Sequence, residues 1–168
     1  MTDIESLYKL YAPDVRRFAF FLSGDPAMAD EITADTFVRA WMAVGRIRQP
    51  TVKSYLFTIA RNAYTDLLRR AVRHRQLDEN MPDTRISAEM QIEQNSEVRA
   101  VLVALQQLPE MDRTALLMRA LDEMPYEEIA ETLGITVVTA KVKVHRARLK
   151  LMQTRQAWRE IVAAPGAK

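Results

Sequence analysis

Residues 125–151 read PYEEIAETLGITVVTAKVKVHRARLKL, and their pattern predicts two helices joined by a short turn. Pro125 and the acids that follow it suit the first turn of a helix, and Gly134 suits its C-terminal end. Thr136 is a good N-cap for a second, basic helix. A helix, a three-residue turn that contains glycine and a further helix form the helix-turn-helix pattern.

The second half of this stretch also has features of a strand. From Thr139 to Leu151 apolar and basic residues alternate, as they do in a half-buried strand. A strand would need a partner, and the chain offers no turn residues at His145-Arg146. Four apolar residues share one stripe of a helix: Ala140, Val144, Ala147 and Leu151. We therefore predict a helix, whose outward face carries Val138, Lys141, Val142, His145 and Arg148.

Composition favours a helical protein without disulfides. The 168 residues include only four glycines and no cysteine, and 27% are charged. The absence of cysteine excludes disulfides and thiolate metal sites. We see neither a signal peptide nor an apolar run of the roughly 18 residues that suggest a membrane span, so we expect a cytoplasmic protein without direct membrane insertion.

The distribution of charge along the chain is more informative than the net charge of +2. Basic clusters lie at 69–75 and 141–150, whereas 25–35 carries acids and no Lys or Arg. Two basic clusters and one acidic face predict two contacts with polyanions and a partner of another kind.

The periodicity predicts an all-α fold of two small helical domains joined by a flexible linker. We expect an opening pair of helices interrupted at Ala12-Pro13, and later helices near 27–44, 56–67, 98–105 and 112–121. Periodicity fades between Gln76 and Asn95. The expected divisions are a first domain at 1–75, a linker at 76–95, a helix-turn-helix domain at 96–155 and a tail at 156–168.

Motifs in both halves resemble bacterial RNA polymerase sigma factors of the extracytoplasmic-function (ECF) group. In the first half these are Asp30-Glu31-Ile32, Thr36-Phe37, Arg39-Ala40-Trp41 and Ile59-Ala60-Arg61-Asn62, with Asp66 and Arg69-Arg70. In the second half they are Leu105, Leu108-Pro109-Glu110, Arg113, Tyr126 to Glu131, Leu133-Gly134-Ile135 and His145 to Arg148. Their order, with a linker between the two sets, makes the resemblance specific.

The resemblance implies a division of labour between the two halves. Region 2 of the family docks on the clamp helices of the polymerase and opens and reads the −10 promoter element. Region 4 reads the −35 element as duplex and touches the polymerase flap. An anti-sigma factor typically controls such a protein, and no cofactor or small-molecule substrate is implied.

Carried onto this chain, the resemblance implies three sets of residues. The polymerase-docking set is Asp30, Glu31, Asp35, Phe37, Arg39 and Trp41. The −10 set is Arg48, Lys53, Tyr55, Arg61, Asn62, Asp66, Arg69 and Arg70. The −35 set is Thr136, Val138, Thr139, Lys141, Val142, Lys143, His145, Arg146 and Arg148.

The chain departs from the family pattern at several of these places. Ala34 stands where glutamine is usual, Tyr55 replaces a usual tryptophan, and 49–53 lacks the common loop motif. In the last helix Val137-Val138 replaces an acid and glycine, and Val142 replaces serine. The usual promoter sequence is therefore not implied for this chain.

The residues can also be interpreted without the family. Exposed cations on a helix are often only a solvated face, and exposed valines are often merely tolerated. Phe57 and Trp41 are expected in the core, whereas Tyr55 is the preferred stacking partner for an unpaired base. Glu127, Glu128 and Glu131 suit the N-terminal turn of a helix.

The sequence contains no sign of an enzyme. Asp30, Glu31 and Asp35 do not share one helix face, and both histidines lie among arginines, a poor setting for a metal. No phosphate-binding loop or nucleophile motif is present. Two alternatives to a sigma factor stay open: a polymerase-independent helix-turn-helix regulator, and a sigma-like decoy that binds an anti-sigma factor.

Overall fold

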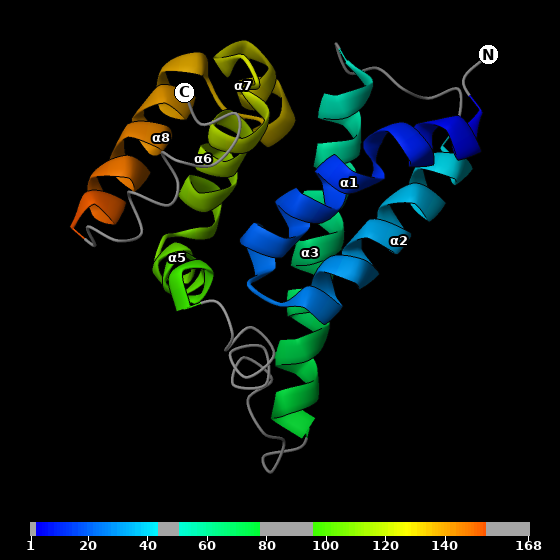
Figure 1. Cartoon of the computed structure of the whole chain (residues 1–168), viewed down its shortest axis with the longest axis horizontal. Coiled ribbons are helices and arrows are strands. Elements are labelled where there is room, and N and C mark those ends of the chain that lie inside the picture. The colour runs from blue at the N-terminus through cyan, green and yellow to red at the C-terminus, as the bar shows by residue number, and fades with distance from the viewer. Residues whose placement is uncertain (1–2, 44–50, 78–95, 154–168) are drawn as a thin grey trace.

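The computed structural model describes residues 3–43, 51–77 and 96–153, and these ranges form helices and no strand (Figure 1). The all-α prediction is confirmed. The helices are α1 (Ile4–Ser23), α2 (Pro26–Met42), α3 (Val52–Leu77), α5 (Ser96–Gln106), α6 (Glu110–Asp122), α7 (Tyr126–Leu133) and α8 (Val137–Met152).

The first helix corrects the prediction of an interrupted opening pair. α1 runs from Ile4 to Ser23 through Pro13, which is exposed. A proline inside a helix removes one backbone donor and usually costs about 3 kcal/mol. Leu7 before it and Val15 and Phe18 after it are all buried, so packing on both sides of Pro13 holds the helix in one piece.

Three consecutive residues form the turn between α1 and α2. Gly24 has a φ of 73°, the left-handed conformation that glycine adopts without strain, and its N–H donates to Phe20 O at 2.8 Å. The Asp25 carboxylate then caps α2, because Oδ1 accepts from the Ala27 N–H at 2.9 Å. Pro26 takes the first position of α2.

The helices of the first half enclose an apolar centre. α1 packs against both α2 and α3, and α2 packs against α3. The rings of Phe18 and Phe57 stack with their centroids 4.8 Å apart, and both are fully buried. The prediction that Phe57 belongs to the core is confirmed.

The second half is built around α6, which lies against α5, α7 and α8. Leu116 and Met118 of α6 are fully buried, as are Ile129 of α7 and Val144 of α8. The buried residues of the two halves belong to one continuous cluster. α1 reaches across to α5 and α6, and α3 reaches across to α7. The halves therefore pack directly on each other, as Figure 1 shows.

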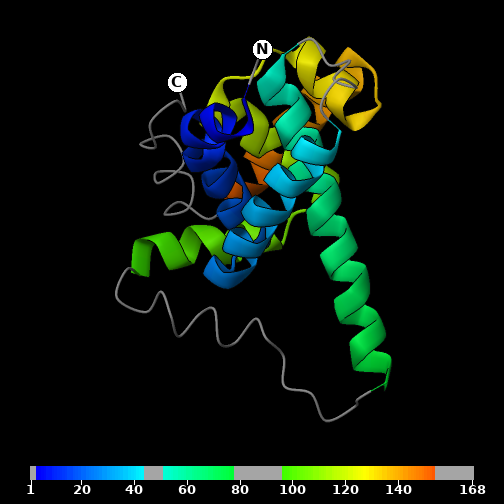
Figure 2. The same cartoon turned by 90° about the vertical axis from the view of Figure 1, so that its right-hand side faces the viewer.

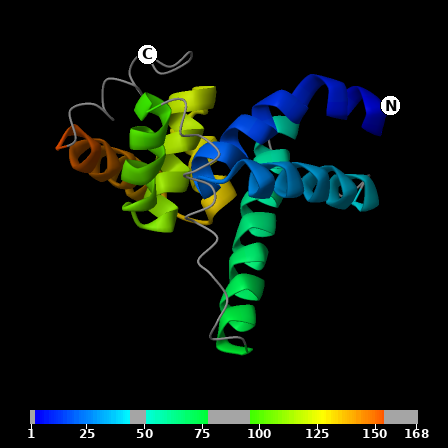
Figure 3. The same cartoon turned by 60° about the horizontal axis from the view of Figure 1, so that its bottom comes forward.

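The C-terminal part of α3 extends beyond the packed helices. Figures 2 and 3 show it projecting past α1 and α2, so that this part of α3 stands apart from the rest of the first half. Arg69, Arg70, Arg73, His74 and Arg75 are all exposed there. The expected linker began at Gln76, but α3 continues to Leu77, and 78–95 lies outside the described residues.

Candidate nucleic-acid and polymerase interfaces

The helix-turn-helix forms at the predicted residues. α7 ends at Gly134, which has a φ of 67°, and the Ile135 N–H donates to Ala130 O at 2.9 Å. The Thr136 hydroxyl then caps α8 by accepting from the Thr139 N–H at 3.1 Å. One glycine and one threonine thus set the direction of α8 relative to α7.

The two faces of α8 match the helical prediction. Ala140, Val144, Ala147 and Leu151 are at most 1% exposed. The opposite face carries Val138, Lys141, Val142 and His145, all exposed, together with the half-buried Arg148. Within α8 there is no Asp or Glu. This face therefore offers cations and apolar groups to a partner.

Two residues of the predicted −35 set form ion pairs with the buried Asp112 of α6. Arg146 donates from Nε to Asp112 Oδ2 at 2.7 Å and from Nη2 to Oδ1 at 3.0 Å, and Lys143 Nζ lies 3.4 Å from the same Oδ1. Burial pushes the pKa of the Asp112 carboxyl upward, but Arg146 and Lys143 outweigh burial and leave this pKa below its ordinary value. Arg146 and Lys143 therefore orient α8 on α6.

The other polar residues of the −35 set have different surroundings. The hydroxyls of Thr136 and Thr139 lie 2.8 Å apart within the cap of α8. Lys141 Nζ lies 5.8 Å from the centre of the Tyr126 ring, a cation–π contact with α7. Lys141 is nevertheless exposed, as is His145.

The −10 set divides into paired and exposed residues. Arg61 forms a two-point pair with Glu110, at 3.0 Å from Nε and 3.1 Å from Nη2. Lys53 Nζ lies 3.2 Å from Asp122 and 3.3 Å from Asp14. The structure therefore places Arg61 and Lys53 at the contact between the two halves.

The remaining members of the −10 set lie along α3. Asn62, Arg69 and Arg70 are exposed, and Tyr55 is partly buried and packs against the core. Asp66 accepts from Arg39 of α2 at 2.9 Å. Arg48 lies outside the described residues.

The predicted docking set lies on α2, and its two aromatic members differ in exposure. Phe37 is only 5% exposed and meets Tyr8 edge-on at 5.0 Å, so it supports α2 from inside. Trp41, which we expected in the core, is 62% exposed beside Val38 and Met42, which are also exposed. Trp41 follows Val38 by three positions, so an apolar surface forms at the end of α2.

The acids of α2 are partly paired. Arg16 of α1 donates to Asp30 at 2.8 Å, and Arg39 lies 3.0 Å from Asp35. Glu31 is exposed. Across the described residues, no group of His, Asp or Glu side chains could hold a metal ion.

Comparison with known proteins identifies the family. Residues 7–74 match the family model of Sigma-70 region 2, and residues 99–151 match that of Sigma-70, region 4. The ECF RNA polymerase sigma factor EcfG of Rhodopseudomonas palustris is 31% identical over 83% of this chain and 77% of its own length. The chain belongs to the ECF sigma factors.

One further relative and one solved structure are also similar to this sigma factor. SigE of Mycolicibacterium smegmatis is 33% identical over 90% of this chain, and the chain spans 61% of that relative's length. The Bartonella quintana sigma factor RpoE, solved in complex with the anti-sigma factor NepR, superposes with a TM-score of 0.76. It is 24% identical, and the match covers 93% of this chain and 98% of that one. This likeness shows the shared fold.

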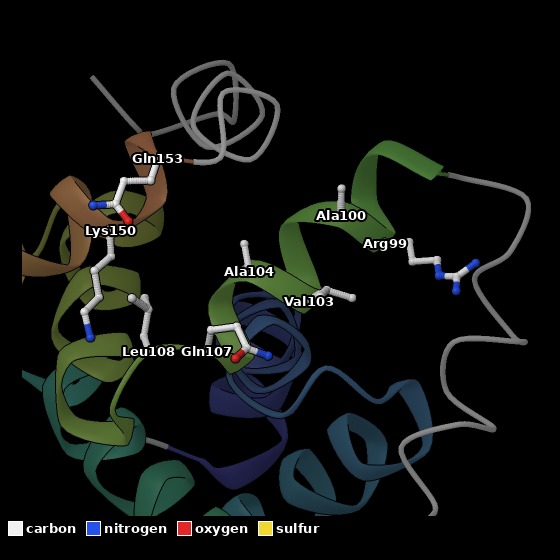
Figure 4. A pocket seen from close by; sticks show the side chains of 8 residues that line it. All are labelled: Arg99, Ala100, Val103, Ala104, Gln107, Leu108, Lys150 and Gln153. Atoms are coloured by element: carbon white, nitrogen blue, oxygen red, sulfur yellow. The ribbon is translucent and has the colours of Figure 1, made fainter.

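A cavity of about 730 Å³ opens between α5 and the end of α8 of the sigma factor. Figure 4 shows Ala100, Val103 and Ala104 of α5 on one side, and Lys150 and Gln153 from the α8 end on the other. Among the described residues that line this cavity there is no Asp or Glu.

Sequence reasoning missed the polar contacts between the two halves. Arg113 of α6 is 6% exposed and donates to Leu22 O at 2.6 Å and to Tyr64 Oη at 2.8 Å. Glu128, assigned only to a helix start, accepts from Ser54 Oγ at 2.8 Å. Arg113 stands in the quoted motif and gave a signal of importance, but nothing in the sequence named its acceptors.

The carboxyl group of Asp122 is buried in this contact between the halves. Its side chain is 1% exposed and meets Arg17 at 3.4 Å and Lys53 at 3.2 Å. Burial raises the pKa of the Asp122 carboxyl above its ordinary value, and the two cations offset only part of this rise. The same contact therefore contains a carboxyl group that resists ionisation.

Proposed function

We propose that this sigma factor binds core RNA polymerase and directs it to a limited set of promoters. The observation that carries the proposal is the outward face of α8, the second helix of the helix-turn-helix. This face holds Lys141, His145 and Arg148 and no acid, which suits the phosphates and acceptor-rich base edges of a duplex. We assign this face to the −35 element.

The first half would then engage the polymerase and the −10 element. An exposed apolar surface of Val38, Trp41 and Met42 next to the acids of α2 supports a protein-docking role, because an exposed apolar group with a polar rim is typical of interfaces. The exposed Asn62, Arg69 and Arg70 on α3 suit a melted strand. Residues 1–75 and 96–155 would act as two units joined by 76–95.

An anti-sigma factor is the proposed regulator. The solved structure of RpoE is a complex with the anti-sigma factor NepR, and that of CnrH is a complex with the cytosolic domain of CnrY. CnrH superposes on this chain with a TM-score of 0.67 and 24% identity, over 92% of this chain and 88% of that one. In the present conformation Arg61 and Lys53 are occupied by acids of the second half, so this arrangement supports an inactive form.

The chain would act in the cytoplasm by binding and without catalysis of its own. Within residues 3–43, 51–77 and 96–153, no helix combines the length and apolar character that crossing a bilayer needs. The polymerase would supply the chemistry. We therefore expect no catalytic site on this chain.

Transcription in vitro with purified core enzyme tests the proposal. We expect Lys141→Ala with Arg148→Ala to abolish promoter-specific transcripts while core binding is retained. We avoid Arg146→Ala because its guanidinium is bound to Asp112. The control is Lys9→Ala, which removes an exposed cation outside both basic clusters, and it should transcribe normally.

A second pair of variants tests the polymerase side. Trp41→Ala should weaken binding to core enzyme about tenfold or more, as truncation of an aromatic anchor does at interfaces. Val72→Ala removes another exposed apolar side chain and should bind normally. Failure of the chain to bind core enzyme, with tight duplex binding on its own, would favour a polymerase-independent regulator. If the chain binds neither core enzyme nor duplex DNA, the sigma-like decoy is favoured.

A further inference from the structure

Two valines on the outward face of α8 lie outside the hydrophobic core. Val138 is 71% exposed and Val142 is 51% exposed. Their neighbour Val137 differs, because it is partly buried and packs against the core. A branched residue on an exposed helix surface is slightly unfavourable for the helix, so packing and propensity leave Val138 and Val142 unexplained.

The position of these valines points to a duplex. They lie in the first two turns of the second helix of a helix-turn-helix, the part that reaches base edges in the major groove. Lys141 and His145 share their face, and α8 contains no acid that would repel phosphate. Among the base edges of that groove, the 5-methyl group of thymine is the apolar one.

We propose that Val138 and Val142 contact the 5-methyl groups of thymines in the −35 element, and so select thymine at two positions. This inference rests on the proposed function, since it assigns the base preference of the same face. The valines are one helical turn apart, about 6 Å along the axis, and base pairs rise by about 3.4 Å. The two thymines should therefore lie within about two base-pair steps.

The apolar stripe continues beyond the valines. Leu149 and Met152 follow at helical spacing, each 50% exposed, near the C-terminal end of α8. They lie two or more turns past Val142, where a recognition helix leaves the base edges. A helix of another protein chain could cover the whole stripe, and the experiment must separate that occupant from DNA.

Deoxyuridine provides the test, because it lacks only the 5-methyl group of thymine. Holoenzyme made with the full chain is first used to select promoters from a library with a randomised −35 region. Each thymine of the selected element is then replaced by deoxyuridine, and promoter affinity is measured. We expect a loss of about fourfold at each of two positions, the effect of removing one buried methyl-sized group.

Serine variants assign each position to a residue. Holoenzyme made with Val138→Ser or with Val142→Ser should bind promoters with thymine and with deoxyuridine equally well at one of the two positions. At the other position the preference for thymine should remain. Val72→Ser is the matched control, since Val72 is 54% exposed on α3, and it should keep both preferences. Circular dichroism of the serine variants should show an unchanged helix content.

The outcomes separate this inference from the function on which it rests. If holoenzyme selects no −35 sequence, the proposed function fails. If it selects one, but deoxyuridine binds like thymine at every position, the valine inference is overturned and the function stands. If the serine variants lose self-association and deoxyuridine still binds like thymine, the apolar stripe is assigned to protein contacts. The valine inference is overturned in that case too.

Discussion

Asp112 of α6 holds Arg146 of α8 at two points, with its carboxylate 2.7 Å from Nε and 3.0 Å from Nη2. The Asp112 side chain is 1% exposed, so the pair fixes the helix that we assign to DNA from its inner side. Asp112→Ala should lower the free energy of unfolding by about 1–3 kcal/mol, because it removes hydrogen bonds to a charged group. Urea denaturation measures this loss.

Glu131→Ala is the control for Asp112. Glu131 is exposed on α7, and its removal should change the unfolding free energy by less than about 0.5 kcal/mol. An equal effect of the two substitutions would show that the Asp112 pair contributes nothing specific to stability.

Asp112 and Asp122 should respond to pH in opposite directions. The pKa of Asp112 is lowered in the folded protein, so its stabilising contribution is present above its unfolded pKa of about 3.9 and is lost as the pH falls through the folded value. The pKa of Asp122 is raised, so its contribution is complete below about 3.9 and is lost as the pH rises through the folded value.

Two asparagine variants reveal these opposite slopes. Relative to Asp122→Asn, the wild type should lose stability as the pH rises above about 4. Relative to Asp112→Asn, it should lose stability as the pH falls below about 4. Unfolding free energies measured across this range would contradict us if both differences had the same sign.

Arg113 should not tolerate lysine. Its guanidinium donates to Leu22 O at 2.6 Å, to Tyr64 Oη at 2.8 Å and to Leu108 O at 3.3 Å, and a single ammonium group cannot reach all three. We expect Arg113→Lys to cost about 1–3 kcal/mol of unfolding free energy. Arg16→Lys, at an exposed pair, should be nearly neutral in the same measurement.

Gly134→Ala should destabilise the helix-turn-helix through the backbone alone. Gly134 has a φ of 67°, and an added Cβ would meet no atom within 4 Å. The left-handed conformation costs an L-residue about 1–2 kcal/mol. Glu123 already adopts a φ of 51°, so Glu123→Gly should be neutral or slightly stabilising. A similar loss of thermal stability in both variants would contradict this account.

Local sequence was sufficient to predict most helices, but not whether a helix continues through a proline. Turn residues and spacing predicted where α2, α7 and α8 begin, because a cap acts within one helical turn. Pro13 misled the prediction for α1, since local propensity favoured a break and the packing of residues on both sides of it overrode that preference.

The site was predicted less completely than the fold. The motifs placed the exposed cations and valines of α8 correctly, because the core stripe of a helix fixes its opposite face. They did not show that Arg146, whose side chain is 51% exposed, also binds Asp112. Trp41 was expected in the core because large aromatic residues are highly buried on average, yet it lies outside.

Residues close together in the chain were sufficient to predict most of the helices, the helix-turn-helix and the resemblance to the family. Which charged groups meet depends instead on how the helices pack. Arg61 and Glu110 are 49 positions apart, and Arg146 and Asp112 are 34 apart. An ion pair requires the two charges to lie within a few ångströms of each other. Helix packing sets that distance, and the spacing of the residues along the chain does not.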